Sequence, residues 1–277
     1  MENSRYIENF QVRKMWGRVN LHWGNINEDV NILVGINGSG KTTLLNLIYD
    51  FYNGQKPKKN LVEFVGGSEI SSPVTYIRSF DVPAASRKKT ESLLLQELKH
   101  TINQNGEGTS FFDYRMKMLN FPEQSSTIEK RIDRFFELVN SLFEETGKKI
   151  AIDPQNNTLV FSVKGTEKLL TVGGKLLTVN DKFLTVGGDK VQLDQLSSGE
   201  KQILLILTTV FLQEERPSVL LMDEPEISLH ISWQDRLIDL IRELNPNCQL
   251  ILTTHSPNIF ANGWEDKIVF MNDLESD

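Results

Sequence analysis

One segment near the N-terminus combines glycines, a lysine and a hydroxyl at the spacing of a phosphate-binding loop. Residues 35–42 read Gly-Ile-Asn-Gly-Ser-Gly-Lys-Thr and fit the pattern G-x-x-x-x-G-K-[ST]. Glycines let the backbone curl so that successive N–H groups point inward, and a following helix adds the positive end of its dipole. A glycine-rich turn that only caps a helix would explain the glycines but not the lysine and threonine beside them. The segment therefore predicts a nucleoside triphosphate site.

The side chains at the end of this loop suit different parts of a bound Mg²⁺–triphosphate. We expect Lys41 to reach the β- and γ-phosphates and the Thr42 hydroxyl to ligate Mg²⁺, with Thr43 a candidate for the α-phosphate. The predicted cofactors are therefore ATP and Mg²⁺. The predicted nucleotide-binding residues of the loop are Gly35, Asn37, Gly38, Ser39, Gly40, Lys41, Thr42 and Thr43.

Two adjacent acids follow an apolar segment in the C-terminal half of the chain. Residues 219–222 read Val-Leu-Leu-Met and predict a buried strand, which delivers Asp223 and Glu224 to the edge where open α/β sheets bind ligands. Neighbouring side chains on an extended backbone point different ways. We therefore assign Asp223 to the metal and Glu224 to the general base for an attacking water. The alternative is a pair of solvated acids at a strand end.

A third segment has the features of an anion site at the start of a helix. Residues 196–200 read Leu-Ser-Ser-Gly-Glu, and Ser197 with Glu200 has the spacing of a capping box. Taken alone, the pattern predicts only a well-capped helix. A helix N-terminus with a free serine hydroxyl is nevertheless suited to an anion.

The elements that must position these residues predict an α/β fold of the P-loop type. Buried strands that alternate with helices give a mostly parallel sheet covered on both sides, and the first strands are expected to be antiparallel. Strands are expected at residues 6–14, 19–23, 31–34, 74–80, 219–222, 249–253 and 267–271, and helices at about 44–52, 196–212 and 231–244.

A different kind of sequence interrupts this pattern. We expect residues 1–82 and 191–277 to form the α/β core and residues 83–190 to form an inserted, mainly helical lobe with short hairpins. Ser126 and Glu129 have capping-box spacing, which predicts the start of an amphipathic helix that runs to about Thr146. Residues 149–153 and 158–163 flank a turn-forming tetrad and predict a hairpin.

Three consecutive copies of a seven-residue unit occupy residues 168–188 of this lobe. Each copy joins strand-prone residues to Gly-Gly or Asn-Asp, which tolerate a tight hairpin turn, so the repeat predicts a small meander. The favoured interpretation is a tandem duplication that lengthens a surface hairpin without functional effect. A binding ribbon, or an edge that pairs with a partner chain, is the alternative.

Composition excludes several classes of protein. The 277 residues are 39% hydrophobic and carry a net charge of −7, so the whole molecule is not steered to nucleic acid. Cys248 is the single cysteine and no signal-like segment precedes the first strand, so we expect a cytoplasmic protein. The longest apolar stretch, residues 203–212, is about half of a membrane span, so no membrane is predicted. The histidines show no zinc-site spacing with the cysteine.

The serine-containing segment also resembles the signature sequence of ABC-type ATPases. It lies 157 residues after Lys41 (198 − 41) and just before the acidic strand. In that family the signature of one subunit faces the γ-phosphate bound by another. The resemblance implies that Ser197, Ser198 and Gly199 bind ATP in trans, in a homodimer formed through ATP or in a higher homo-oligomer. Ser198 stands where transporter signatures carry glycine.

Two more segments extend the resemblance. Residues 225–230 look like the loop that passes along the dimer interface, and residues 253–257 look like the switch segment, which implies that His255 contacts the γ-phosphate region. A surface residue or a metal ligand is the alternative for His255. Glu200 replaces the usual signature glutamine, and together with the acidic loop this resembles the SMC/RecF/OLD-like group rather than transporter ATPases.

Two interpretations are open for several further residues. Arg78 is a candidate for the position of the transporter coupling glutamine or a plain surface arginine, and Trp16 and Trp23 are candidates for adenine stacking or, preferably, core packing. The basic runs at residues 56–59 and 87–89 are solvated loops or contacts to phosphates.

The resemblance implies an ATP-hydrolysing head that controls another protein. Compact ATPases of this appearance resemble ATPase components of bacterial antiphage systems of retron and Septu type. Only 22 residues follow His255 (277 − 255), so we expect a separate effector, a nuclease or toxin. The alternative is a DNA repair or maintenance ATPase of SMC/RecF type with nucleic acid as a possible partner. A transporter subunit is less well supported, because no glutamine marks the coupling loop.

Overall fold

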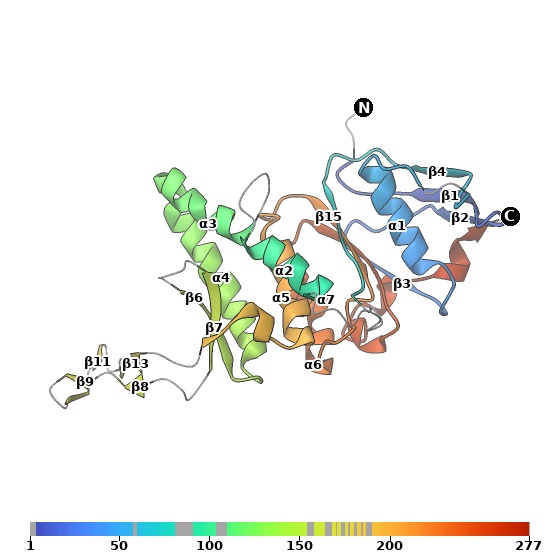
Figure 1. Cartoon of the computed structure of the whole chain (residues 1–277). Helices are drawn as coiled ribbons and strands as arrows, with labels where there is room; N and C mark the ends of the chain where they lie inside the picture. The colour runs from blue at the N-terminus through green and yellow to red at the C-terminus, as the bar shows by residue number, and fades with distance from the viewer. Residues whose placement is uncertain are drawn as a thin grey trace. The chain divides into compact units, whose positions relative to one another are not determined.

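The chain divides into two compact units (Figure 1). A computed structural model describes residues 4–57, 60–80, 91–103, 110–153, 158–163 and 190–276, and the backbone of short strands between 168 and 186. The first unit comprises Met1–Arg87 and Gln213–Asp277, and the second comprises Lys88–Leu212. We expected residues 191–212 in the α/β core, but they belong to the second unit. The division into a core and an inserted lobe as functional domains stays a prediction.

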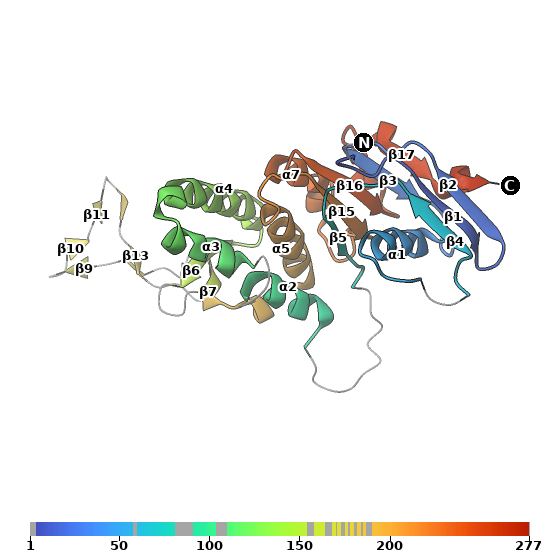
Figure 2. The ribbon, with the colours of Figure 1, turned by 90° about the horizontal axis from the view of Figure 1, so that it is seen from above.

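A five-stranded parallel sheet forms the frame of the first unit (Figure 2). Every residue of its two central strands is buried, which explains their apolar runs without alternation. The predicted mostly parallel α/β sheet is therefore confirmed. In the order β17-β3-β16-β15-β5, the strands are Ile268–Phe270, Val30–Val34, Cys248–Thr253, Ser218–Asp223 and Val74–Ile77.

A second, antiparallel sheet of the first unit has the order β18-β2-β1-β4. Helix α1 (Lys41–Tyr52) buries Leu44, Leu45, Leu47 and Ile48 in one apolar cluster with residues of both sheets. This packing fixes the start of α1 relative to the ends of the parallel strands. The antiparallel strands are Glu275–Ser276, Val19–Trp23, Phe10–Met15 and Phe64–Gly67.

The second unit combines four helices with a three-stranded antiparallel sheet. Phe111, Phe135 and Phe211, from three different helices, stack at centroid distances of 4.8–6.0 Å and hold these helices together. Strands β6 and β7 form the predicted hairpin. The helices are Leu93–Asn103 (α2), Phe111–Asn120 (α3), Ser125–Phe143 (α4) and Ser198–Phe211 (α5), and the sheet contains Lys148–Asp153 (β6), Thr158–Val163 (β7) and Lys190–Val191 (β14).

Two helix boundaries differ from the sequence expectations. The predicted cap at Ser126 is wrong: a 3₁₀ turn at Pro122–Gln124 leads directly into α4, so Ser126 already lies inside the helix. The single helix expected over residues 231–244 is divided into α6 (Ile231–Gln234) and α7 (Leu237–Leu244), because residues 235 and 236 form a turn.

The three repeat copies pair with one another in a cyclic pattern rather than as a simple meander. The first copy pairs with the second through β9 and β10, and the second pairs with the third through β11 and β12. Strand β13 of the third copy pairs with β8 of the first. The strands are Lys168–Leu169 (β8), Thr171–Val172 (β9), Lys175–Leu176 (β10), Thr178–Val179 (β11), Lys182–Phe183 (β12) and Thr185–Val186 (β13).

The helices are short or polar by the standard of a membrane span. None of those within the described residues combines the length and the apolar character that a bilayer span requires.

Candidate nucleotide site

The glycine-rich loop connects the end of β3 to the start of α1. Gly38 and Gly40 have φ angles of 81° and 99°, in the region that side chains disfavour. A Cβ at Gly40 would lie 2.8 Å from the Trp16 ring, so both backbone conformation and space require glycine there. The hydroxyl of Ser39 is buried and has no hydrogen-bond partner among the described residues. An unpaired hydroxyl inside a curled, glycine-rich loop fits a phosphate oxygen as its partner.

Lys41 is the first residue of α1, and its ammonium group is turned back into the loop. Nζ donates to the carbonyl oxygens of Gly35 at 2.8 Å and Ile36 at 3.3 Å, and it lies 2.9 Å from Nε2 of His255. Burial lowers the pKa of Lys41, against the opposing charges of Glu224 and Asp223. The ammonium group is therefore held where a triphosphate in the loop would meet it.

The two predicted metal ligands lie together. Asp223 ends β15, and its Oδ1 atom accepts hydrogen bonds from the hydroxyls of Thr42 at 3.0 Å and Thr253 at 2.7 Å. Hard oxygen donors of this kind are the ligands that Mg²⁺ prefers. The residues present thus fit Mg²⁺ held by Thr42 and Asp223 beside a phosphate.

Glu224, the next residue, has a strained backbone. Its φ angle is 48°, and its N–H donates to the Thr253 carbonyl oxygen at 3.2 Å and hydroxyl at 3.1 Å. Burial and the negative charge of Asp223 raise the pKa of the Glu224 carboxyl above its ordinary value, while the charge of His255 opposes this. A carboxyl whose pKa is raised in this way is suited to accept a proton from water near neutral pH.

His255 lies beside both Lys41 and Glu224. Its Nε2 atom is 3.4 Å from Glu224 Oε1, and its backbone N–H donates to Glu226 Oε1 at 2.8 Å. The same Oε1 atom accepts the hydroxyl of Thr254 at 2.7 Å. Glu226 therefore holds the segment that carries the histidine.

A second side chain connects the same two segments. Gln234 of α6 donates to the Leu229 carbonyl oxygen at 3.0 Å and accepts the Ser256 hydroxyl at 2.7 Å. The sequence placed Glu226 in the predicted interface loop and Thr253 in the predicted switch segment, but it predicted no contact for either residue and no role for Gln234. The acids and threonines near the two motifs were visible, but no local pattern shows which of them pair.

The predicted signature residues, Ser197, Ser198 and Gly199, lie in the second unit, so their contacts are given within that unit alone. Ser197 caps α5: its hydroxyl accepts the N–H of Glu200 at 3.2 Å, and Glu200 Oε2 accepts the N–H of Ser197 at 2.8 Å. The predicted capping box is therefore confirmed. Ser197 and Ser198 are exposed, whereas Gly199 is buried. Two serines thus stand at the exposed, positive end of a helix.

The remaining candidates have mixed outcomes. Trp23 is buried in the core, as preferred, whereas Trp16 is 41% exposed beside Gly40. The Arg78 guanidinium lies over the rings of Tyr49 and Tyr76, 6.0 and 5.5 Å from their centroids. Asn37 is exposed on the loop. The basic run 87–89 and two lysines of the run 56–59 lie outside the described residues.

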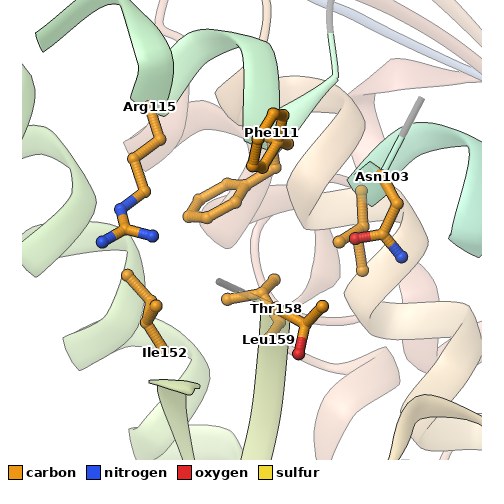
Figure 3. A pocket seen from close by; sticks show the side chains of 8 residues that line it. Asn103, Phe111, Arg115, Ile152, Thr158 and Leu159 are labelled. Carbon is orange, nitrogen blue, oxygen red and sulfur yellow. The ribbon is translucent and has the colours of Figure 1, made fainter. Parts of the chain in front are cut away.

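A pocket in the second unit offers a different chemistry. Asn103, Phe111, Arg115, Ile152, Thr158 and Leu159 surround it, and Figure 3 shows apolar side chains on several sides. Within the described residues, no group of three or more His, Cys, Asp or Glu side chains is arranged to hold a metal ion.

The chain is similar to several known proteins. Septu protein PtuA of Bacillus thuringiensis is 24% identical, over 85% of this chain and 68% of PtuA. The Escherichia coli protein named "Retron Ec83 probable ATPase" is 32% identical over 42% of this chain, but the match spans only 27% of that relative. The fold is that of a solved SMC head bound to the C-winged helix domain of ScpA, with a TM-score of 0.56, 16% identity and coverage of 96% and 94%.

A family model matches the larger part of the chain. It covers residues 98–261, which include the signature, the acidic strand and the switch segment. The chain therefore belongs to the family described as "AAA domain, putative AbiEii toxin, Type IV TA system".

Proposed function

We propose that this protein is an ATPase head that binds Mg²⁺–ATP in its first unit and hydrolyses it between two copies of the chain. The observation that carries the proposal is the meeting of five side chains from three distant segments. Thr42 bonds Asp223, and His255 lies beside both Lys41 and Glu224. A structural turn needs none of these contacts.

Each residue then has a distinct task. The backbone N–H groups of the loop and the Lys41 ammonium bind and orient the phosphates, and Thr42 and Asp223 would hold Mg²⁺. When bound, Mg²⁺ supplies positive charge that neutralises the phosphate oxygens. Glu224 orients the attacking water and accepts its proton, which its raised pKa favours. His255, next to both Lys41 and Glu224, stabilises charge that develops on the transferred phosphoryl group.

A second copy would complete the site. Ser197 and Ser198 are exposed at the N-terminus of α5, where unpaired N–H groups and the helix dipole favour an anion. We assign that anion to the γ-phosphate held by another copy. ATP then bridges two heads, and its hydrolysis releases them.

The biological role that we propose is control of a separate effector, a nuclease or toxin, in antiphage defence. It rests on the relationship to Septu PtuA and to a retron ATPase. A DNA maintenance ATPase is the second candidate, because the fold is that of an SMC head. Purification from the native host separates the two, since either an effector protein or DNA should accompany the chain.

The variant Glu224→Gln tests the catalytic proposal. Turnover should fall by about 10³-fold because the proton acceptor is lost, while ATP affinity stays similar and ATP-bound dimers accumulate. Phosphate release and size-exclusion chromatography with ATP and Mg²⁺ measure both effects. Glu8→Gln, a change of the same kind at an exposed residue, is the matched control. A Glu224→Gln chain that stays monomeric at saturating ATP contradicts the two-headed arrangement.

A further inference from the structure

The Glu200 carboxylate at the signature is bonded to the Lys148 ammonium group and to the Ser197 backbone, with the Thr146 hydroxyl as a further hydrogen-bond donor. Its Oε2 atom accepts the backbone N–H of Ser197 at 2.8 Å, and its Oε1 atom lies 2.7 Å from Nζ of Lys148. The Glu200 side chain is 1% exposed and that of Lys148 is 21% exposed. Lys148 begins β6, 52 residues before Glu200 in the chain. A strand of the hairpin sheet is thus bonded to the cap of the signature helix.

Stability alone does not explain this ion pair. A buried pair of charges is often no more stabilising than two apolar side chains of similar size. Of the bonds to the Glu200 carboxylate, a capping box requires only the one from the Ser197 backbone, and an exposed glutamate can accept that bond. Lys148 adds a fixed charge that holds the other carboxylate oxygen and thereby determines which way Oε2 points.

Loss of the lysine would disturb the serine. Burial alone would raise the pKa of Glu200, but the hydrogen bonds from Lys148, Ser197 and Thr146 lower it, so the carboxylate is ionised in its buried position. Without Lys148, a buried charge would remain with one donor fewer. The carboxylate would then turn toward water or take up a proton, and either change weakens its bond to Ser197.

We infer that Lys148 is a positioning residue of the signature, which acts through Glu200 to hold the start of α5 in the geometry that binds a γ-phosphate. This inference rests on the proposed function, since the phosphate belongs to ATP bound by a second copy. The partner recognised by this positioned helix end is therefore a nucleoside triphosphate in another copy of the chain.

The pairing of the strands shows at which end of the sheet the repeat is connected. Lys148 pairs with Val163 at the end of β7, and Ser162 pairs with Lys190 at the start of β14. The seven-residue copies lie in the connection between these two strands, at residues 168–188. The chain thus leaves and re-enters the sheet at the end where Lys148 lies. From that end of the sheet, the Lys148 side chain reaches the Glu200 carboxylate of the signature cap.

Replacement of Lys148 by methionine tests the inference. Lys148→Met should lower kcat about tenfold, because the signature contacts phosphate only in the closed, reacting complex. The affinity of an isolated head for a fluorescent ATP analogue should change less than about twofold, because the phosphate loop is intact. Lys148→Arg should restore most of the turnover, since a guanidinium also binds a carboxylate. Lys149→Met, at the exposed neighbouring position of β6, is the matched control.

A double-mutant cycle separates positioning from general folding. In Glu200→Gln the buried charge is absent, so addition of Lys148→Met should reduce kcat no further. Additive losses, or Lys148→Met turnover equal to that of Lys149→Met, would overturn the inference. A wild-type chain without ATP turnover contradicts the proposed function and removes this inference with it. An active wild type with an unaffected Lys148→Met variant removes the inference alone.

Discussion

The ammonium nitrogen of Lys41 and the Nε2 atom of His255 lie 2.9 Å apart, although 214 residues separate them in the chain. An ammonium group only donates, so a hydrogen bond between these two atoms requires that Nε2 accepts and carries no proton. Glu224 Oε1 lies 3.4 Å from the same Nε2 atom and can only accept while it is ionised. Nε2 can therefore bond to Lys41 when unprotonated or to Glu224 when protonated, but not to both.

This geometry predicts a specific loss in His255→Ala. Removal of the ring takes away the group between the ammonium and the carboxyl that we propose as the base, so kcat should fall by about 10²-fold. The backbone bonds of the loop remain, so ATP affinity should change little. His22→Ala, at an exposed histidine of β2, is the control. Steady-state phosphate release and nucleotide titration measure the two quantities. An equal loss of affinity and turnover would place the histidine in ground-state binding instead.

The buried ionised carboxylate of Glu200 predicts a dependence of stability on pH. Its pKa is lower in the folded chain than its ordinary value, so folding is stabilised above the ordinary pKa, and the stabilisation is lost as pH falls through the folded pKa. At pH 7, Glu200→Gln should lower the free energy of unfolding by about 1–2 kcal/mol, because charge-assisted bonds are lost. The difference from wild type should shrink below pH 4.5.

Urea unfolding of the nucleotide-free chain between pH 7 and pH 3 measures this difference. Glu129→Gln, at an exposed residue of α4, should change stability little at any pH. A Glu200→Gln deficit that stays constant through the acid range would show that the carboxylate is not ionised through its bonds to Lys148 and Ser197.

Two serines with identical sequence patterns predict opposite effects on stability. Ser197 and Ser126 each precede a glutamate by three residues. Ser197 caps α5, whereas Ser126 lies within α4 and the cap position of α4 makes no side-chain bond. Ser197→Ala should cost about 1 kcal/mol, while Ser126→Ala should be neutral or stabilising by about 0.5 kcal/mol. Chemical denaturation compares the two, and equal losses would contradict the assigned start of α4.

The same pair shows where sequence patterns succeed and where they stop. The capping-box spacing marks a helix start only if the preceding residues are not helical, and the 3₁₀ turn at Pro122–Gln124 removes that condition for Ser126. The glycine-rich loop and the acid pair are contiguous segments next to buried strands, so the parallel sheet and the edge at which these residues meet could be predicted. The bonds of Glu226 to His255 and of Lys148 to Glu200 join segments 29 and 52 residues apart and have no local signature.

Removal of the middle repeat copy, residues 175–181, tests whether the repeat influences the ATPase. The first and third copies pair directly through β8 and β13, so they can remain paired without the second. The pairing of β7 with β14, and hence the end of the sheet that carries Lys148, should then be retained. We expect kcat within about twofold of wild type, because the described contacts that position Ser197, from Glu200 and Lys148, remain. A tenfold lower kcat with unchanged ATP affinity would instead show that the repeat acts on the signature, and Lys148→Met in the shortened chain would then cause little further loss.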